Sequence, residues 1–343
     1  MIRNDIKTLA AYHVQDASGL LKLDAMENPY PLPDALRKAW AEVLARSNIN
    51  RYPDADMLEL RRKIAARENV NADQVLIGNG SDEIIQMLMM AVEPGACAVP
   101  QPTFVMYETI ARWLKRPLTG VPLKADFSLD AQSFLQVCAR EKASIAFLAC
   151  PNNPTGNMWP LETIEKIAKN FRGLLVIDEA YAPFAERTHN SMVGGNVMLL
   201  RTFSKLGMAG LRLGYALADA NLIADLNKVR LPYNINSLSQ ISAEFFLEHD
   251  AVFTEQAQKI RQQRGRMTAA IMAMDGVEVF PSQANFLLLR VADADAVFNG
   301  LIDAGILIKN LHNKGSLLQN CLRITVGLPE ENDRLLNALK ELI

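Results

Sequence analysis

The sequence predicts an α/β fold: a mainly parallel sheet covered by helices on both faces, followed by a smaller C-terminal α/β domain. Short apolar runs recur along most of the chain, which is typical of buried strands. Amphipathic helical segments lie between most of them, for example at residues 58–68, 82–92 and 161–170, and this alternation favours parallel strands joined by helices. The expected strands are residues 75–77, 96–99, 145–149, 174–177, 197–200 and 211–217.

The last third of the chain changes character. Residues 240–274 contain no proline and only one glycine, Gly265, so they are expected to form long helices. Apolar strands are then expected near residues 285–290 and 322–326, and a closing helix from Glu330. This second α/β pattern predicts a small domain, and a chain of 343 residues has room for it beside one large domain.

Composition excludes several classes of function. The formal net charge of −2 gives no reason to expect nucleic acid or an anionic membrane as a partner. The longest apolar stretches, such as residues 84–92, are too short to span a bilayer. The first residues lead into no apolar segment with a cleavage site, so we expect no signal peptide and a cytoplasmic protein. The four cysteines are scattered and have no nearby histidine cluster, so neither a disulfide framework nor a metal site is expected.

A glycine-rich turn follows the first expected strand, and parallel sheets bind ligands at the ends of their strands. The segment from Gly78 to Asp82 opens a helix, and its unpaired N–H groups and the helix dipole form a candidate anion site at Gly80 and Ser81. A plain turn with Ser81 or Asp82 as the helix cap is the alternative. The carboxylate of Asp82 would repel a phosphate, so only its backbone is expected to contribute.

A carboxylate and an amine follow two further strands. Asp178 ends an apolar run, and because burying it unpaired would be costly, it needs a partner. Lys205 follows the next run. An Asp that caps a helix and an exposed Lys at a strand end are the simpler alternatives. The flanking Thr202, Ser204 and Arg212 favour a functional site, since two hydroxyls and a guanidinium offer the charge-assisted hydrogen bonds that a phosphate requires.

Together these groups match the needs of pyridoxal 5′-phosphate. This cofactor requires a lysine that bonds to it, a carboxylate that keeps its ring nitrogen protonated, polar groups for the ring oxygen and a cation for the phosphate. With the segment 151–156 (Pro-Asn-Asn-Pro-Thr-Gly) and Tyr181 among them, the motifs resemble those of the fold-type I aminotransferases, and within them the histidinol-phosphate aminotransferases. The resemblance covers nearly the whole chain.

The resemblance implies a role for each residue of the cofactor site. Lys205, Asp178 and Tyr181 would be catalytic, with Lys205 bonded to the cofactor and Asp178 paired with the ring nitrogen. Tyr181 and Asn153 would hydrogen-bond to the ring oxygen. The expected cofactor-binding residues are Gly80, Ser81, Asp82, Phe104, Asn153, Asp178, Tyr181, Thr202, Ser204, Lys205, Arg212 and Tyr52.

Three aromatic residues are implicated by the same resemblance. Phe104 matches the residue that stacks on the cofactor ring; tyrosine is commoner there, and the nearby Tyr107 could compensate for the missing hydroxyl. Tyr52 matches a tyrosine that reaches the cofactor phosphate of the neighbouring subunit. The resemblance therefore implies a homodimer with shared active sites.

Substrate-binding residues and a domain division are implied as well. Arg323 would bind an anionic group of the substrate, and Lys309 stands where many relatives have a second arginine, although a lysine binds phosphate only as a point charge. The full expected set is Tyr12, Asn28, Arg323, Lys309 and Asn285. The implied division is an N-terminal arm of residues 1–27, a large domain of residues 28–240 that binds pyridoxal phosphate, and a small domain of residues 241–343.

The implied function is that of a transaminase in histidine biosynthesis, which converts L-histidinol phosphate and 2-oxoglutarate to imidazole acetol phosphate and L-glutamate and back. A broad aromatic aminotransferase and a pyridoxal-phosphate-dependent decarboxylase of phosphorylated amino acids share Lys205, Asp178 and Arg212, so the core motifs leave both open. A regulator built on the same fold would carry an added DNA-binding domain, which we do not expect before an arm that starts near residue 10. A nucleotide-binding module is disfavoured, because no G-x-G-x-x-G segment opens a helix with an acidic residue about twenty positions on.

Overall fold

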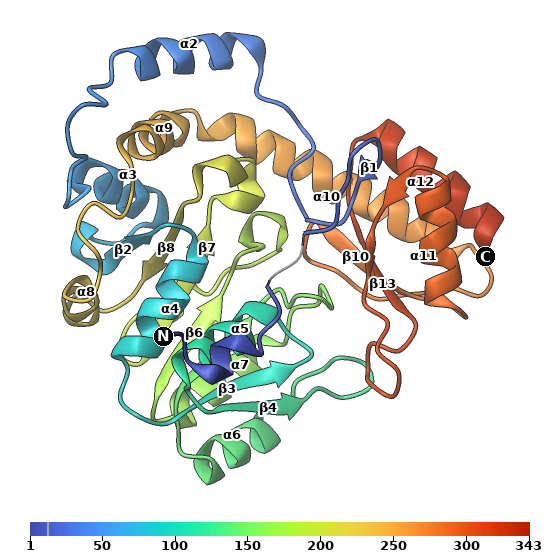
Figure 1. Ribbon diagram of the computed structural model, residues 1–343, viewed down its shortest axis with the longest axis horizontal. Coiled ribbons are helices and arrows are strands. Elements are labelled where there is room, and N and C mark those ends of the chain that lie inside the picture. The colour runs from blue at the N-terminus through green and yellow to red at the C-terminus, as the bar shows by residue number, and fades with distance from the viewer. Residues whose placement is uncertain (12–13) are drawn as a thin grey trace.

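The computed structural model describes residues 1–11 and 14–343, and a seven-stranded mixed sheet lies at its centre (Figure 1). The strand order is β2-β8-β7-β6-β5-β3-β4. β8 runs antiparallel to both of its neighbours, and the remaining pairs are parallel. The strands are β2 (Val75–Gly78), β3 (Ala96–Gln101), β4 (Leu118–Pro122), β5 (Ala143–Ala149), β6 (Leu174–Asp178), β7 (Val197–Thr202) and β8 (Gly214–Leu217).

All strands predicted for this sheet are present; β4 is an addition, and the strand predicted from residue 211 is shorter than expected. β4 contains a glycine and a proline, so it carries no apolar run; it is an edge strand that pairs only with β3 in this sheet, and edges tolerate proline. The strand predicted from residue 211 begins only at Gly214, because a 3₁₀ turn (Ala209–Leu211) and the left-handed Arg212 (φ +53°) precede it.

Helices cover both faces of this sheet, as the alternation of its buried residues requires. Leu76, Phe147 and Val176 pack on α4 (Ser81–Ala91), α5 (Val105–Leu114) and α8 (Ala220–Asn227). The next residue in two of these strands, Ile77 and Ile177, faces the other layer. That layer contains α3 (Leu58–Glu68), α6 (Ala131–Arg140), α7 (Leu161–Asn170) and α9 (Ser237–Glu248).

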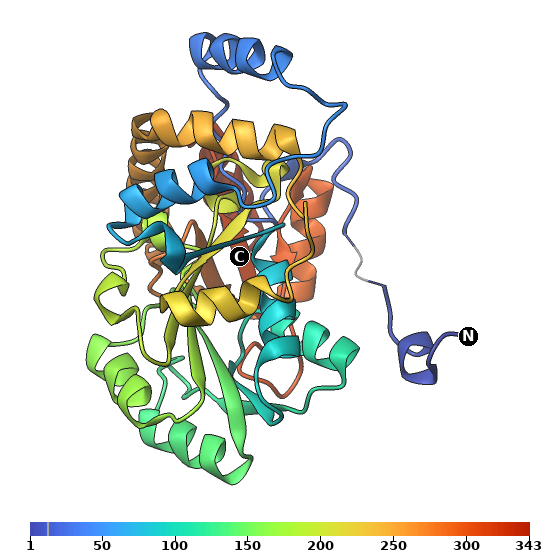
Figure 2. The same cartoon turned by 90° about the vertical axis from the view of Figure 1, so that its left-hand side faces the viewer.

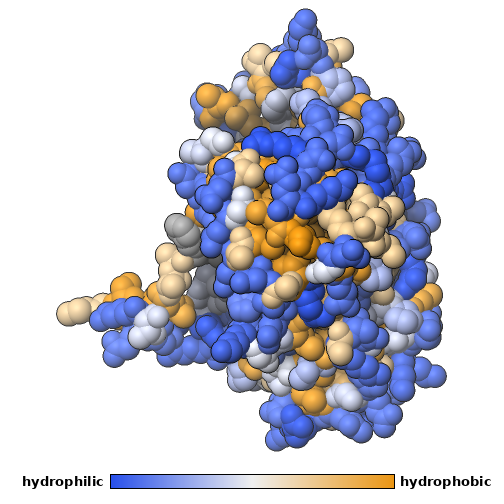
Figure 3. Space-filling view, turned by 90° about the vertical axis from the view of Figure 1, so that its right-hand side faces the viewer, coloured by the Kyte–Doolittle hydropathy of each residue, from blue (hydrophilic) through white to orange (hydrophobic). Residues whose placement is uncertain are grey.

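A second sheet of four antiparallel strands, in the order β12-β13-β10-β9, lies beside the first (Figure 1). Its strands are β9 (Glu278–Val279), β10 (Phe286–Arg290), β12 (Lys309–Asn310) and β13 (Cys321–Thr325). It packs with α10 (Asp250–Met272), α11 (Ala294–Asp303) and α12 (Pro329–Leu342). On the face that carries α11 and α12, hydrophobic side chains gather at the centre of a mainly hydrophilic surface (Figure 3).

The N-terminal segment contributes to this second unit. β1 (Leu21–Lys22) pairs in parallel with β11 (Ile306–Leu307), and Leu23 and Met26 belong to the same hydrophobic core as β10 and β13. Figure 2 shows α1 (Asn4–Lys7) projecting from the body of the molecule at the right, and α2 (Asp34–Ala45) lies at the top. The domain limits at residues 27 and 240 stay predictions. None of the described helices combines the length and the apolar character that crossing a membrane needs.

We predict that Gly214→Ala destabilises the protein by about 1–3 kcal/mol, as overpacking does in other interiors. A Cβ at this position would lie 2.4 Å from the backbone nitrogen of Ser81, so the start of α4 would have to move. Gly265→Ala is the matched control: its Cβ would meet open space in α10, and alanine stabilises a helix by up to about 1 kcal/mol over glycine. Thermal unfolding of both variants tests this, and an unchanged melting temperature for Gly214→Ala would contradict it.

Candidate functional site

A cavity of about 270 Å³ lies at the carboxyl edge of the large sheet, beneath the segment that follows β1. It brings together every predicted cofactor-binding residue except Tyr52. Its lining consists of Ala25, Met26, Glu27, Gly80, Ser81, Asp82, Phe104, Ala149, Pro151, Asn153, Asp178, Ala180, Tyr181, Thr202, Ser204, Lys205, Ala209 and Arg212.

Lys205 reaches this cavity from a short 3₁₀ turn (Ser204–Leu206) that follows β7. Its Nζ donates a hydrogen bond to the carbonyl oxygen of Ala25 at 3.2 Å and lies 6.0 Å from the ring centre of Tyr181. Burial lowers the pKa of Lys205 to about 8, and the nearby cations Arg323 and Arg212 act in the same direction. The amine is therefore more readily deprotonated, and so more nucleophilic near neutral pH, than an exposed lysine.

Asp178 is the last residue of β6, and its side chain points into the same cavity. Burial raises its pKa to about 6, although hydrogen bonds from the Tyr107 hydroxyl (2.6 Å, to Oδ2) and the Ala180 N–H (3.1 Å, to Oδ1) favour the ionised form. A buried carboxylate held in this way is suited to pairing with a cationic N–H group of a ligand.

Tyr107 is the residue of this site whose contact the sequence did not reveal. It lies one turn into α5 from Phe104, and its ring stacks on Phe147 with centroids 4.8 Å apart. By sequence its hydroxyl could compensate for the one that Phe104 lacks; in the structure this hydroxyl donates to Asp178. Its position three residues after Phe104 predicts that Tyr107 lies near the cavity, but nothing in the local sequence signals its bond to Asp178.

A chain of hydrogen bonds joins the cavity to the small sheet. Asn153 Nδ2 donates to the Tyr181 hydroxyl at 3.1 Å, and Arg323 donates to Asn153 Oδ1 at 2.6 Å. Burial raises the pKa of Tyr181, although the positive charge of Arg323 opposes this. Lys309 stands directly opposite Arg323 in the β12–β13 ladder and is exposed, so the two cations share one face of that sheet.

The opposite end of the cavity carries hydroxyl groups, the start of a helix and an arginine. The start of α4 contributes Gly80 and Ser81, and Thr202 Oγ1 donates to Ser204 Oγ at 3.0 Å. Arg212 lies 3.5 Å from Ser204 Oγ and 3.9 Å from Asp82. Gly80 has a φ of +83°, and a Cβ there would come 3.2 Å from the Arg212 guanidinium, so glycine leaves room for the arginine. Burial raises the pKa of Asp82, although the positive charges of Arg212 and Lys205 oppose this.

The remaining predicted residues lie elsewhere. Asn28 donates to the Leu206 carbonyl (2.9 Å), and Asn285 donates to the Met26 carbonyl (2.9 Å), so both side chains brace the loops around the cavity. Tyr52 is 81% exposed and stacks on Tyr233, with ring centroids 4.6 Å apart. Tyr12 lies outside the described residues.

Comparison with known proteins places the chain in a family. Residues 18–339 match the family model of aminotransferases of class I and II. Histidinol-phosphate aminotransferase 2 of Cupriavidus pinatubonensis is 47% identical over 98% of this chain and 95% of its own length. Histidinol-phosphate aminotransferase 1 of Burkholderia lata is also 47% identical, over 99% of this chain and 97% of its own. The chain belongs to the histidinol-phosphate aminotransferase family.

Solved structures of an aminotransferase and of a decarboxylase share the fold. Histidinol-phosphate aminotransferase from Sinorhizobium meliloti, in complex with pyridoxal 5′-phosphate, superposes with a TM-score of 0.89 at 25% identity, over 99% of this chain and 97% of that one. L-threonine-O-3-phosphate decarboxylase from Porphyromonas gingivalis superposes with a TM-score of 0.81, also at 25% identity, over 94% and 99%. The family resemblance and the α/β fold class predicted from the sequence are thereby confirmed.

The burial of Asp178 makes a prediction for the cofactor-free protein. Its folded pKa of about 6 exceeds the ordinary 3.8, so the carboxyl favours folding below pH 4, and this contribution is lost as the pH rises through 6. Asp178→Asn should therefore be more stable than the wild type at pH 8, by up to about 3 kcal/mol, and no more stable near pH 4. Urea unfolding of the two proteins without cofactor at both pH values measures the difference.

Tyr107→Phe supplies the opposite control. It removes one hydrogen bond to the ionised Asp178, which raises the pKa of that carboxyl further. We expect this variant to be less stable than the wild type, with the greater loss at pH 8. If the wild type and Asp178→Asn have the same free energy of unfolding at pH 8, burial of the Asp178 carboxylate does not destabilise the protein.

Proposed function

We propose that the protein is a pyridoxal-phosphate-dependent transaminase of histidine biosynthesis, which converts L-histidinol phosphate and 2-oxoglutarate to imidazole acetol phosphate and L-glutamate and back. The observation that carries this proposal is the cavity in which Lys205 and Asp178 meet, with Arg212 at one end and Arg323 hydrogen-bonded to its wall. The names of relatives that are 44–48% identical support the substrate. A cytoplasmic location accompanies the proposal, since all four cysteines are free and buried.

The donors and acceptors of the cavity fit pyridoxal 5′-phosphate. The hydroxyls of Thr202 and Ser204, the Arg212 guanidinium and the start of α4 would hold the phosphate. Asp178 would pair with the ring nitrogen, and Phe104 lines the wall on which the ring would lie. When bound, the cofactor supplies an electron sink that stabilises negative charge on the substrate's α-carbon.

Tyr181 and Asn153 would bind the ring oxygen of the cofactor. They already share a hydrogen bond, so the two side chains are oriented before a ligand arrives. Lys205 would act as nucleophile and as the base that carries the proton away from the α-carbon, and its lowered pKa keeps part of it neutral near pH 7. The Ala25 carbonyl holds its Nζ at the cavity wall.

Arg323 and Lys309 would bind the anionic ends of both substrates. Histidinol phosphate has a phosphate and no carboxylate, whereas glutamate has two carboxylates, so one cationic pocket must serve both. Arg323 is largely buried and held by Asn153 and the Asp24 carbonyl, which fixes its direction. Lys309 is exposed and adds a second charge on the same face.

We predict that turnover efficiency with histidinol phosphate exceeds that with histidinol, histidine or phenylalanine by about tenfold to a hundredfold per phosphate contact, since a charge-assisted bond contributes about 1.5–3 kcal/mol. Arg323→Ala should impair both half-reactions, because glutamate uses the same pocket. Lys309→Ala should weaken use of the phosphorylated substrate more than use of glutamate. Steady-state kinetics with each donor measures these effects.

The same assay separates the alternatives. Comparable turnover of phenylalanine or histidine would replace the proposal with a broad aromatic aminotransferase. Release of carbon dioxide from a phosphorylated amino acid, without formation of glutamate, would favour the decarboxylase class, to which one structural neighbour belongs.

We further propose a homodimer in which Tyr52 reaches the partner's cofactor phosphate. The exposed apolar side chains Ile49, Tyr52, Tyr233 and Leu238 surround a surface hollow of about 440 Å³, and Leu231 is 70% exposed nearby in sequence. An apolar patch of this kind is typical of a protein–protein contact. Arg51 also lines the hollow and would add a positive charge at its rim.

Mixing Tyr52→Ala with Lys205→Ala, each impaired alone, should restore activity under conditions that exchange subunits. A mixed dimer has one site with both defects and one with neither, so random reassortment predicts recovery of about a quarter of wild-type activity. Mixing Asp178→Asn with Lys205→Ala is the control: both residues belong to the same subunit's site, and no recovery is expected. Proven exchange without recovery in the first mixture would argue for a site built from one chain.

A further inference from the structure

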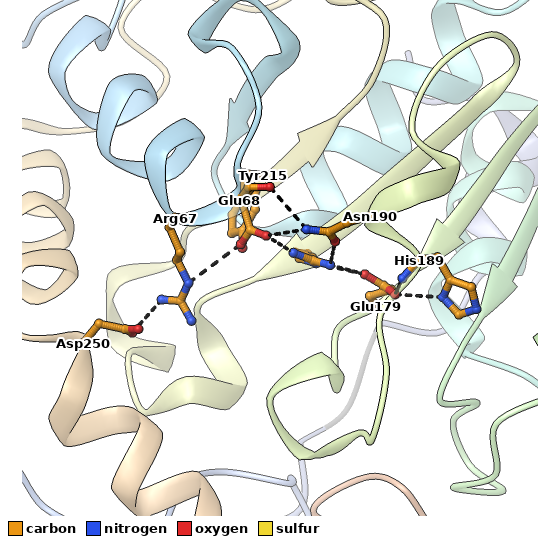
Figure 4. Close-up of polar contacts among 8 residues, drawn as sticks. Arg67, Glu68, Glu179, His189, Asn190, Tyr215 and Asp250 are labelled. Carbon is orange, nitrogen blue, oxygen red and sulfur yellow. Dashed lines mark hydrogen bonds and ion pairs between the residues drawn. The ribbon is translucent and has the colours of Figure 1, made fainter.

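A second group of polar residues is buried on the other side of the sheet edge that carries Asp178 and Thr202. We call it the Arg201 cluster; its members are Arg201, Glu68, Glu179, His189, Asn190 and Tyr215. Figure 4 shows Glu68 and Glu179 at the two sides of this cluster, with His189 beyond Glu179 and Arg67 linking Glu68 to Asp250. None of these residues lines the cofactor cavity among the described residues.

Arg201 is the centre of the cluster and donates hydrogen bonds to three residues. Its Nε donates to Glu179 Oε2 at 2.9 Å, and the rest of the guanidinium donates to Glu68 and to the side-chain oxygen of Asn190. The three charged residues are each less than a tenth exposed.

The two carboxylates of the cluster have further donors of their own. Glu179 Oε1 accepts from both the backbone N–H and Nδ1 of His189, each at 2.8 Å, and Glu68 Oε1 accepts from the Tyr215 hydroxyl at 2.6 Å. Although burial opposes ionisation, the bonds from His189 and Arg201 lower the pKa of Glu179. The carboxylate therefore stays charged and bound to Arg201.

The cluster forms a row across three neighbouring strands. Arg201 and Tyr215 are register partners in β7 and β8, and Glu179 follows the last paired residue of β6. Because side chains alternate between faces, the adjacent residues Asp178 and Thr202 point the other way, toward the cavity. A shift of one residue between these strands would exchange the two sets.

We propose that Arg201 is a positioning residue: its bonds to Glu179 fix the register and spacing of β6 and β7, its bond to Glu68 ties both strands to α3, and Asp178 and Thr202 are thereby held in place for the cofactor. This inference rests on the cofactor roles proposed above for those two residues. A buried ion pair adds little net stability over apolar side chains of similar volume, so geometry is what the cluster supplies. Lysine cannot replace Arg201, since one ammonium lacks the fork that spans three acceptors.

Arg201→Lys tests the inference, and Arg116→Lys is its matched control. Arg116 is also a partly buried arginine beside the large sheet, where it donates to the carbonyls of Met89 (2.8 Å) and Glu93 (2.7 Å), but it lies outside the described cofactor cavity. Three quantities are measured on each protein: the melting temperature without cofactor, the dissociation constant of pyridoxal 5′-phosphate by absorbance titration, and the pH midpoint of the bound cofactor's visible absorbance.

Both variants should melt at a lower temperature than the wild type, and only Arg201→Lys should change the dissociation constant and the absorbance midpoint of the cofactor. We expect it to bind pyridoxal phosphate about tenfold to a hundredfold more weakly, because a misplacement of about 1 Å can cost about a hundredfold at a catalytic site. Its absorbance midpoint should also move, since the distance from Asp178 to the ring nitrogen changes. A loss of melting temperature alone, equal to that of Arg116→Lys, would overturn the positioning role.

Glu179→Gln serves if Arg201→Lys does not fold, since it keeps the side-chain shape and leaves Arg201 paired with Glu68. Weaker cofactor binding with a moved midpoint supports the inference, and wild-type values for both sink it. Asp178→Asn and Thr202→Ala are measured in parallel. If Asp178→Asn keeps the wild-type absorbance midpoint and Thr202→Ala keeps the wild-type dissociation constant, the proposed roles fail and the inference with them; if both quantities change in these variants while Arg201→Lys keeps wild-type values, only the inference fails.

Discussion

The site depends above all on the alternation of side chains at the carboxyl ends of β6 and β7. Two adjacent pairs, Asp178–Glu179 and Arg201–Thr202, divide between the faces of the sheet. One member of each pair faces the cavity, and the other belongs to the buried Arg201 cluster. Since the side-chain period of a strand is two residues, neither set can move along the strand without displacing the other. The positions of the cavity residues are thus tied to the Arg201 cluster, whose members do not line the cavity among the described residues.

Burial of ionisable groups shifts the pKa values of the cavity residues, and it also lowers the stability of the folded protein. The same removal from water raises the pKa of Asp178 and lowers that of Lys205, which pushes the two groups toward their neutral forms. Arg212 and Arg323 add positive charge at either end, which disfavours a charged lysine further. A ligand that brings an anion and a cationic N–H group satisfies all of these groups together. The protein without cofactor is accordingly less stable than it would be with apolar residues in the cavity, and binding of a ligand offsets this loss; active sites commonly lower stability in this way.

The sequence predicted the buried strands and the residues at their ends, because apolar runs mark strands and parallel sheets collect their functional groups at one edge. β4 was not predicted, because its glycine and proline interrupt the apolar run by which a strand is recognised. The contact between Tyr107 and Asp178 and the ion pairs of Arg201 join residues 22 to 133 positions apart, and no local pattern signals such pairs. For Asn28 and Asn285, the resemblance predicted the neighbourhood; their bonds to backbone carbonyls appear only in three dimensions.

The segment at residues 21–28 explains why those two asparagines lie where they do. Its strand pairs with β11, and its backbone carbonyls accept from Lys205 at Ala25 and from Arg323 at Asp24, so one stretch of chain contacts both the amine of Lys205 and the guanidinium of Arg323. Asn285, the residue before β10 of the small sheet, donates to the Met26 carbonyl of this stretch, and Asn28 donates to the Leu206 carbonyl, next to Lys205. A displacement of the small sheet would therefore move the Ala25 carbonyl to which Lys205 Nζ donates. Because Asp24 and Ala25 are adjacent, binding of a substrate anion at Arg323, as we propose, would also act on the carbonyl that holds Lys205 Nζ.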